Sequence, residues 1–65
     1  MNTTRPEDLI LAAMKRSAQP QFSSILPIGI VRAEVCRANE SRGLTEAEME
    51  VFAKRINDLC DQVEL

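Results

Sequence analysis

The clearest hydrophobic pattern in the chain lies in its last third. Apolar residues recur there at alternating intervals of three and four, the spacing of one face of an α-helix: Met49, Phe52, Ile56, Leu59 and Val63. Thr45 and Glu48 have the spacing of a capping box, in which each side chain hydrogen-bonds the other residue's backbone N–H. We therefore predict a helix from about Glu46 to Gln62 whose single apolar seam, Ile56 and Leu59 included, is buried against another helix.

A similar repeat lies upstream and predicts a second long helix. Its apolar positions, again three or four residues apart, are Ile28, Val31, Val35 and Ala38. The connection between the two helices is short and contains Gly43, which permits a left-handed helix end. Because short connections join antiparallel neighbours, residues 25–63 are expected to form an αα-hairpin.

Two starting points are possible for this second helix. Ser23 or Ser24 could cap it with Pro27 inside the first turn, or Pro27 could be its first residue. An alternative interpretation makes residues 25–31 a β-strand, because they are rich in Ile and Val. Pro27, Gly29 and the lack of a second strand argue against it.

A shorter helix is expected near the N-terminus, over about residues 5–18. Thr4 and Glu7 fit a second capping box, and Pro6 is tolerated in a first turn. The apolar arc of this helix is Leu9, Ile10, Leu11, Ala13 and Met14. Residues 19–24 are rich in turn-forming side chains and are expected to be a linker.

These elements indicate an all-α fold: residues 1–65 as a single small helical domain of three helices. A chain of 65 residues buries only about 60% of the surface that its unfolded form exposes, so its own core is small. With no histidine and only two cysteines, one chain cannot supply a closed zinc site of four N/S ligands. Self-association as a homodimer or higher oligomer is therefore expected.

Some apolar residues have no place in the predicted hairpin seam. Leu26, Ile30 and Ala33 lie on the opposite face of the second long helix. The residues expected to contact a partner or a second protomer are Phe22, Ile25, Leu26 and Ile30. The alternative is that the N-terminal helix covers them.

Composition narrows the classes of function. Eight Lys and Arg stand against ten Asp and Glu, a net charge of −2, so no excess positive field attracts nucleic acid or anionic lipid. Without histidine, neither Ser23 nor Ser24 has a base to activate it, and no catalytic, cofactor-binding or metal-binding residue is predicted. Cys36 and Cys60 are expected in the core as small apolar side chains.

The expected cellular location follows from two kinds of segment that the sequence lacks. The longest apolar stretch, residues 25–31, is far shorter than the roughly 20 residues that span a bilayer, so no membrane anchor is predicted. The first eight residues lack a basic segment followed by an apolar one, so no secretory signal is predicted. A cytoplasmic location is therefore expected.

Two short segments resemble known families. Gly43-Leu44-Thr45 is similar to the turn of the helical-hairpin aspartyl-phosphate phosphatases of sporulation control, and the resemblance runs from Ile30 to Val63. The family's Ser-Gln-Glu-Leu-Asp signature aligns with residues 53–57, where Ile56 agrees but Asn57 replaces the acidic residue. Residues 44–52 resemble a helix start in the Hha-like nucleoid regulators, a resemblance that implies binding to another regulator.

Together these features predict a small non-enzymatic regulatory or adaptor protein that modulates or inhibits a protein partner through apolar helix surface. One alternative is a DNA-binding transcriptional regulator with a helix-turn-helix around Gly43. The recognition helix would then begin with Glu46, Glu48 and Glu50, which face phosphates unfavourably. The other alternative is a phosphatase-like hairpin acting on a response regulator.

Overall fold

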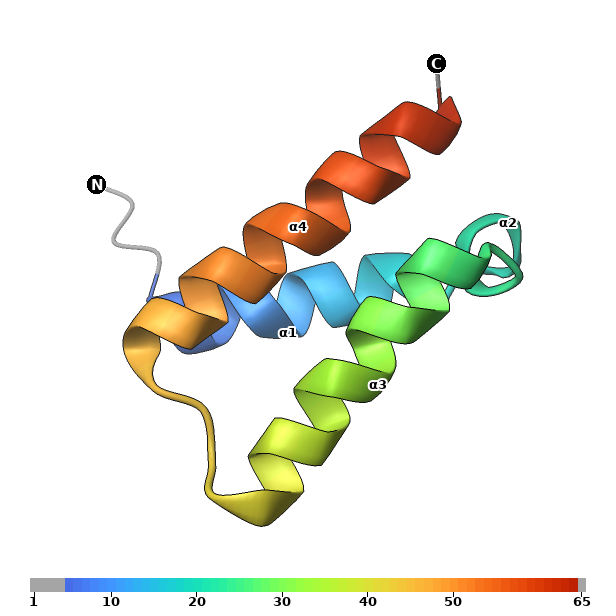
Figure 1. Ribbon diagram of the computed structural model, residues 1–65. Helices are drawn as coiled ribbons and strands as arrows, with labels where there is room; N and C mark the ends of the chain where they lie inside the picture. Colours follow the sequence, from blue (N-terminus) through green and yellow to red (C-terminus); the bar gives the residue numbers. More distant parts are fainter. Residues whose placement is uncertain (1–4, 65) are drawn as a thin grey trace.

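Four α-helices account for most of the chain. This computed structural model describes residues 5–64, and none of them lies in a β-strand. The helices are α1 (Pro6–Ser17), α2 (Pro20–Ser23), α3 (Leu26–Ser41) and α4 (Glu46–Glu64) (Figure 1). The all-α prediction is confirmed for these residues, and the β-strand alternative for residues 25–31 is wrong.

The connection between α3 and α4 has the predicted chemistry. Gly43 adopts a φ of +80°, and its N–H donates to the carbonyl oxygens of Ala38 and Asn39 at 3.1 Å each. The Glu48 N–H donates to Thr45 Oγ1 and the Thr45 N–H donates to Glu48 Oε1, both at 3.1 Å. This reciprocal pair is the predicted capping box, and it fixes where α4 begins.

The start of α3 differs from both predicted versions. Ile25 is the N-cap residue, and no side chain hydrogen-bonds the first turn. Pro27 lies inside this turn, where its missing N–H costs nothing because the first four N–H groups of a helix have no partner within it. Neither Ser23 nor Ser24 is the cap.

The segment expected to be a linker, residues 19–24, contains the short helix α2. Pro20 is its first residue and presets the helical φ angle. Phe22 is 1% exposed, so its burial in the core holds this turn in place. Turn-forming composition was a correct sign of a chain reversal, but it did not show that the reversal is helical.

The N-terminal helix begins after Arg5, whose carbonyl accepts from the N–H groups of Asp8 and Leu9 at 3.0 Å each. Arg5 is the N-cap residue and makes no side-chain cap. Thr4, half of the predicted capping box with Glu7, lies outside the described residues.

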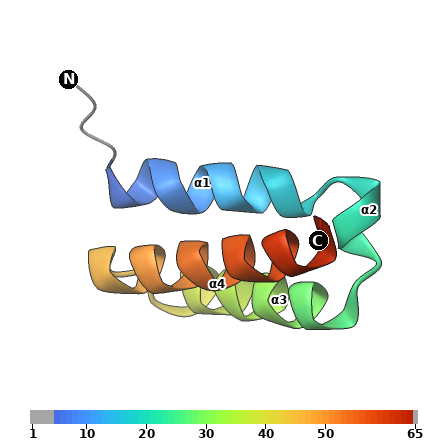
Figure 2. The same cartoon turned by 90° about the horizontal axis from the view of Figure 1, so that it is seen from above.

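The helices form two layers. Figure 2 shows α1 in one layer and α3 with α4 in the other, and Figure 1 shows α1 crossing behind both. The most extensive contact of α4 is with α1, and its contact with α3 is smaller. The sequence assigned the α4 seam to α3 alone, so this pairing is a correction: α4 is shared by two neighbours.

The shared position of α4 shifts its buried face. Ile56 is fully buried as predicted, but Leu59 is only half-buried and Val63 is 39% exposed. Ala53 and Cys60, which the predicted seam left out, are 3% and 0% exposed. The core consists of Ile10, Ala13, Phe22, Ile28, Val31, Val35, Ala53, Ile56 and Cys60.

Candidate functional site

The four residues expected to contact a partner fall into two groups. Phe22 is in the core, and Ile25 is half-buried and packs against it. Leu26 and Ile30 are 74% and 51% exposed, so α1 does not cover them. A contact role for the four residues stays a prediction, and in this conformation only Leu26 and Ile30 present a large surface to a partner.

The exposure of Leu26 and Ile30 follows from the sequence of α3. Its inner side, with Ile28 and Val31, is buried against the other helices. Its outer side, at Leu26, Ile30 and Ala33, is also apolar but faces solvent. A helix that is apolar on all sides is normally buried on all sides. The first half of α3 is therefore covered on one side only.

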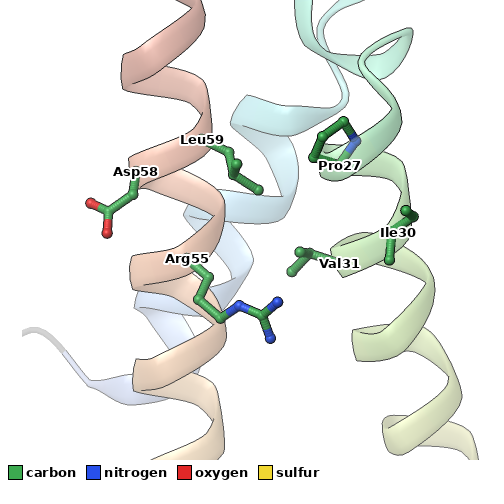
Figure 3. Close-up of a pocket in the computed structure, with 6 residues that line it drawn as sticks. All are labelled: Pro27, Ile30, Val31, Arg55, Asp58 and Leu59. Atoms are coloured by element: carbon green, nitrogen blue, oxygen red, sulfur yellow. The ribbon is translucent and has the colours of Figure 1, made fainter.

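A groove runs between α3 and α4 on the face away from α1 (Figure 3). Its volume is about 360 Å³, and its lining residues are Pro27, Ile30, Val31, Arg55, Asp58 and Leu59. The lining is mostly apolar, with one cation and one anion from α4. Figure 3 shows the Arg55 side chain extending from α4 toward α3, with Asp58 on the outer side of α4.

Both charged residues of this groove have partners on the surface. Arg55 Nη1 lies 3.5 Å from Glu34 Oε2 on α3, and Lys54 Nζ lies 3.1 Å from Asp58 Oδ2 on the next turn of α4. The side chains of all four are more than 40% exposed. Exposed pairs of this kind contribute about 0–1 kcal/mol, so they can exchange partners at little cost.

A smaller hollow continues the groove along α4. It has a volume of about 230 Å³, shares Arg55 with the groove, and contains Val51, which is 57% exposed. Together the two hollows extend from Ala47 to Leu59. At 1.5 Å rise per residue this is about 18 Å, the length of three helical turns.

A second groove, of about 350 Å³, opens between the first half of α1, the end of α3 and the start of α4. Leu11, Met14 and Met49 line it, together with the exposed Cys36. This groove was not predictable from the sequence, because it depends on the angle between α1 and α3, which helical periodicity does not encode.

Arg16 connects the ends of α1 and α4, and this contact was also missed. Its guanidinium donates to Asn57 Oδ1 at 3.1 Å, Asp61 Oδ1 at 2.7 Å and Glu64 Oε1 at 2.8 Å. It also lies 5.7 Å from the centre of the Phe22 ring. The hydrogen bonds to Glu64 and Asp61 raise the pKa of Arg16 above its usual value. The arrangement positions α1 on α4 and leaves no free group for chemistry.

The two cysteines have different environments. Cys60 is fully buried, as predicted, and burial is the main cause that raises the pKa of its thiol. Cys36 is exposed, so its predicted core position is wrong. On α3, residue 36 turns away from the buried side that Val31 and Val35 define, toward the rim of the second groove.

Among residues 5–64, no three His, Cys, Asp or Glu side chains lie together in a way that could hold a metal ion. In the same part of the chain, no helix has both the length and the apolar character needed to cross a membrane.

The chain was compared with known families, proteins and structures. No protein-family model, no curated protein and no solved structure matches it. The function must therefore be argued from the surfaces described above.

Proposed function

We propose that this chain is a small non-enzymatic regulatory or adaptor protein that binds a protein partner. The contact surface in this proposal is the outer face of the hairpin formed by α3 and α4. The partner would be modulated or inhibited because the bound chain covers part of its surface. A cytoplasmic location belongs to the same proposal and suits two cysteines that are both free thiols.

The observation that carries the proposal is the apolar outer side of α3. Leu26 and Ile30 are large apolar residues that are more than half exposed, and they lie on successive turns of one helix. Ile30 also lines the groove between α3 and α4. The groove and the smaller hollow beside it extend for about three turns along α4. This length suits an amphipathic helix, whose apolar residues occupy such a surface at intervals of three and four.

The electrostatics of α4 favour this function over DNA binding. Glu46 and Glu48 occupy the first turn of α4, the part that a recognition helix inserts into the groove. Two hydrogen bonds from the Arg42 guanidinium and one from the Thr45 N–H lower the pKa of Glu48 to about 2. Glu48 is therefore ionised at neutral pH and paired with Arg42.

A photo-crosslinking experiment tests the proposal. A photoreactive amino acid is placed at Leu26 or Ile30 in one set of cells and at Glu50, on the exposed charged side of α4, in another. We expect protein adducts from positions 26 and 30 that are absent from position 50. Ile30→Asp should abolish the adduct formed from position 26.

Two results would contradict the proposal. One is equal crosslinking from positions 26 and 50, which would indicate random encounters. The other is the absence of any protein adduct from positions 26 and 30. Circular dichroism of Ile30→Asp shows whether the helices remain, and we expect no loss because Ile30 is half exposed.

A further inference from the structure

We infer that a second copy of this chain occupies the outer face of α3 and α4, as a two-fold symmetric dimer in which the two α4 helices run antiparallel. This inference rests on the proposed function, because it names the first partner of the same surface.

The layer formed by α3 and α4 has a broad face without cover. The Cα atoms span 34 × 28 × 15 Å, so the molecule is two helix layers thick. The layer of α3 and α4 has α1 on one side and solvent on the other (Figure 2). A face of 34 by 28 Å is large enough to bury the ~800 Å² per partner of a standard interface.

The apolar surface on this face comes from both helices. Pro27 and Ile30 on α3 are exposed, and so is Val51 on α4, while Leu59 is half-buried between them. A second copy that packs here covers these side chains and removes apolar area from water, which is the main driving force of association. It also supplies the outer neighbour that the apolar first half of α3 lacks.

The charges of the face are complementary to the same face of another copy. Arg55 and Asp58 are three residues apart on α4 and both line the groove. A two-fold axis that passes between residues 56 and 57 reverses α4, so Arg55 of each copy faces Asp58 of the other. The dimer thus gains two identical ion pairs, as an isologous interface requires.

Formation of these pairs disrupts little in the single chain. To form the pairs of the dimer, Arg55 gives up its contact with Glu34 at 3.5 Å, and Asp58 gives up its contact with Lys54 at 3.1 Å. Both intrachain pairs are exposed and weak, whereas pairs inside an interface are shielded from water and salt. Any other partner of this face needs an anion opposite Arg55 and a cation opposite Asp58.

Charge reversal provides the test. Sedimentation velocity is run on the wild type, on Arg55→Asp and on Asp58→Arg over a range of concentrations. We expect a wild-type dimer at micromolar concentration. Each single variant places two like charges at both symmetric positions and should raise the dimer dissociation constant at least about tenfold.

Mixing the two variants gives the decisive measurement. In a heterodimer of Arg55→Asp with Asp58→Arg, each reversed residue again faces an opposite charge at both positions. Native mass spectrometry should show the mixed dimer at concentrations where each variant alone is monomeric. Glu50→Arg, an exposed charge reversal on another side of α4, should leave the dissociation constant unchanged.

The inference fails if the wild type stays monomeric well above micromolar concentration, if either variant dimerises as the wild type does, or if the mixture does not associate. A monomeric wild type whose positions 26 and 30 still crosslink to another protein would overturn the dimer and leave the proposed function intact. Mixed-dimer rescue together with crosslinks from positions 26 and 30 to a second copy would support the dimer and the use of this face as a protein contact surface.

Discussion

The two long helices α3 and α4 differ in the residues that they present to solvent. On α4, buried residues such as Ile56 alternate with charged residues such as Glu50 and Lys54 on the sides that face solvent. On α3, the solvent side of the first two turns is as apolar as the buried side. The difference indicates where a partner is best sought, because a charged side is stable in water whereas an exposed apolar side gains free energy when it is covered.

The largest loss of stability from a single substitution is expected on the buried side of α4. Ile56→Ala removes a fully buried side chain from the core and should lower the free energy of unfolding by about 2–5 kcal/mol. Leu26→Ala, at a residue that is 74% exposed, should change it by less than about 0.5 kcal/mol.

Urea denaturation followed by circular dichroism measures both values. The two variants and the wild type are compared at one low protein concentration, because association would add to the apparent stability. Equal losses for Ile56→Ala and Leu26→Ala would show that the outer side of α3 is not a free surface. Leu59→Ala should lie between them, since Leu59 is only half-buried.

The starts of the two helices provide the next test. Thr45 caps α4, and Thr45→Ala should lower the free energy of unfolding by about 1 kcal/mol because the Glu48 N–H loses its acceptor. The start of α3 has no side-chain cap, so Ser24→Ala should change stability by less than about 0.5 kcal/mol. Thermal melts of both variants decide the point, and the reverse order would mean that a serine caps α3 after all.

Lowering the pH should have a smaller effect on stability, through Glu48 at the junction of α3 and α4. The pKa of Glu48 is about 2, below its ordinary value of 4.5, because of hydrogen bonds from Arg42 first and from the Thr45 N–H second. A lowered pKa stabilises the folded state above pH 4.5, and this stabilisation is lost as the pH falls toward 2. The melting temperature of the wild type should therefore fall more steeply over this range than that of Glu48→Gln. Parallel curves would show that the Arg42–Glu48 pair does not stabilise the fold.

The smallest effect on stability concerns the thiols. Alkylation of native protein at about pH 8 should modify the exposed Cys36 on α3 and spare the buried Cys60 on α4, whose pKa is raised by burial. The modified protein should keep its helicity, and both cysteines should react in urea. Mass spectrometry of peptides gives the sites. Faster reaction of Cys60, or a native Cys36–Cys60 bridge, would contradict the assigned positions.

The sequence allowed a good prediction at the connection between α3 and α4 and along the buried side of α3, where the signal is local. The capping box at Thr45, the glycine turn and the buried residues of α3 depend on neighbours along the chain, so short-range spacing was sufficient to predict them. The main docking partner of α4 was not predictable in this way. Periodicity shows which side of a helix is apolar, but it does not show whether α1 or α3 covers it.

The candidate site was predicted in part for the same reason. Leu26 and Ile30 were singled out because the hairpin seam had no room for them, and they are exposed. Phe22 was grouped with them because its place depended on α2, which the linker composition did not reveal. The three partners of Arg16 lie at residues 57, 61 and 64, more than 40 positions away along the chain.

The docking of α1 on α4 has a consequence for synthesis. Most small helical proteins fold early because their contacts are local, yet the first helix here finds its main neighbour in the last one. While a ribosome is still adding residues 46–64, α1 lacks its main neighbour, α4. The hydrogen bonds from Arg16 to α4, which form beside Phe22, cannot form either. The nascent chain therefore exposes its apolar surfaces until the final turns emerge, and then folds as a single unit.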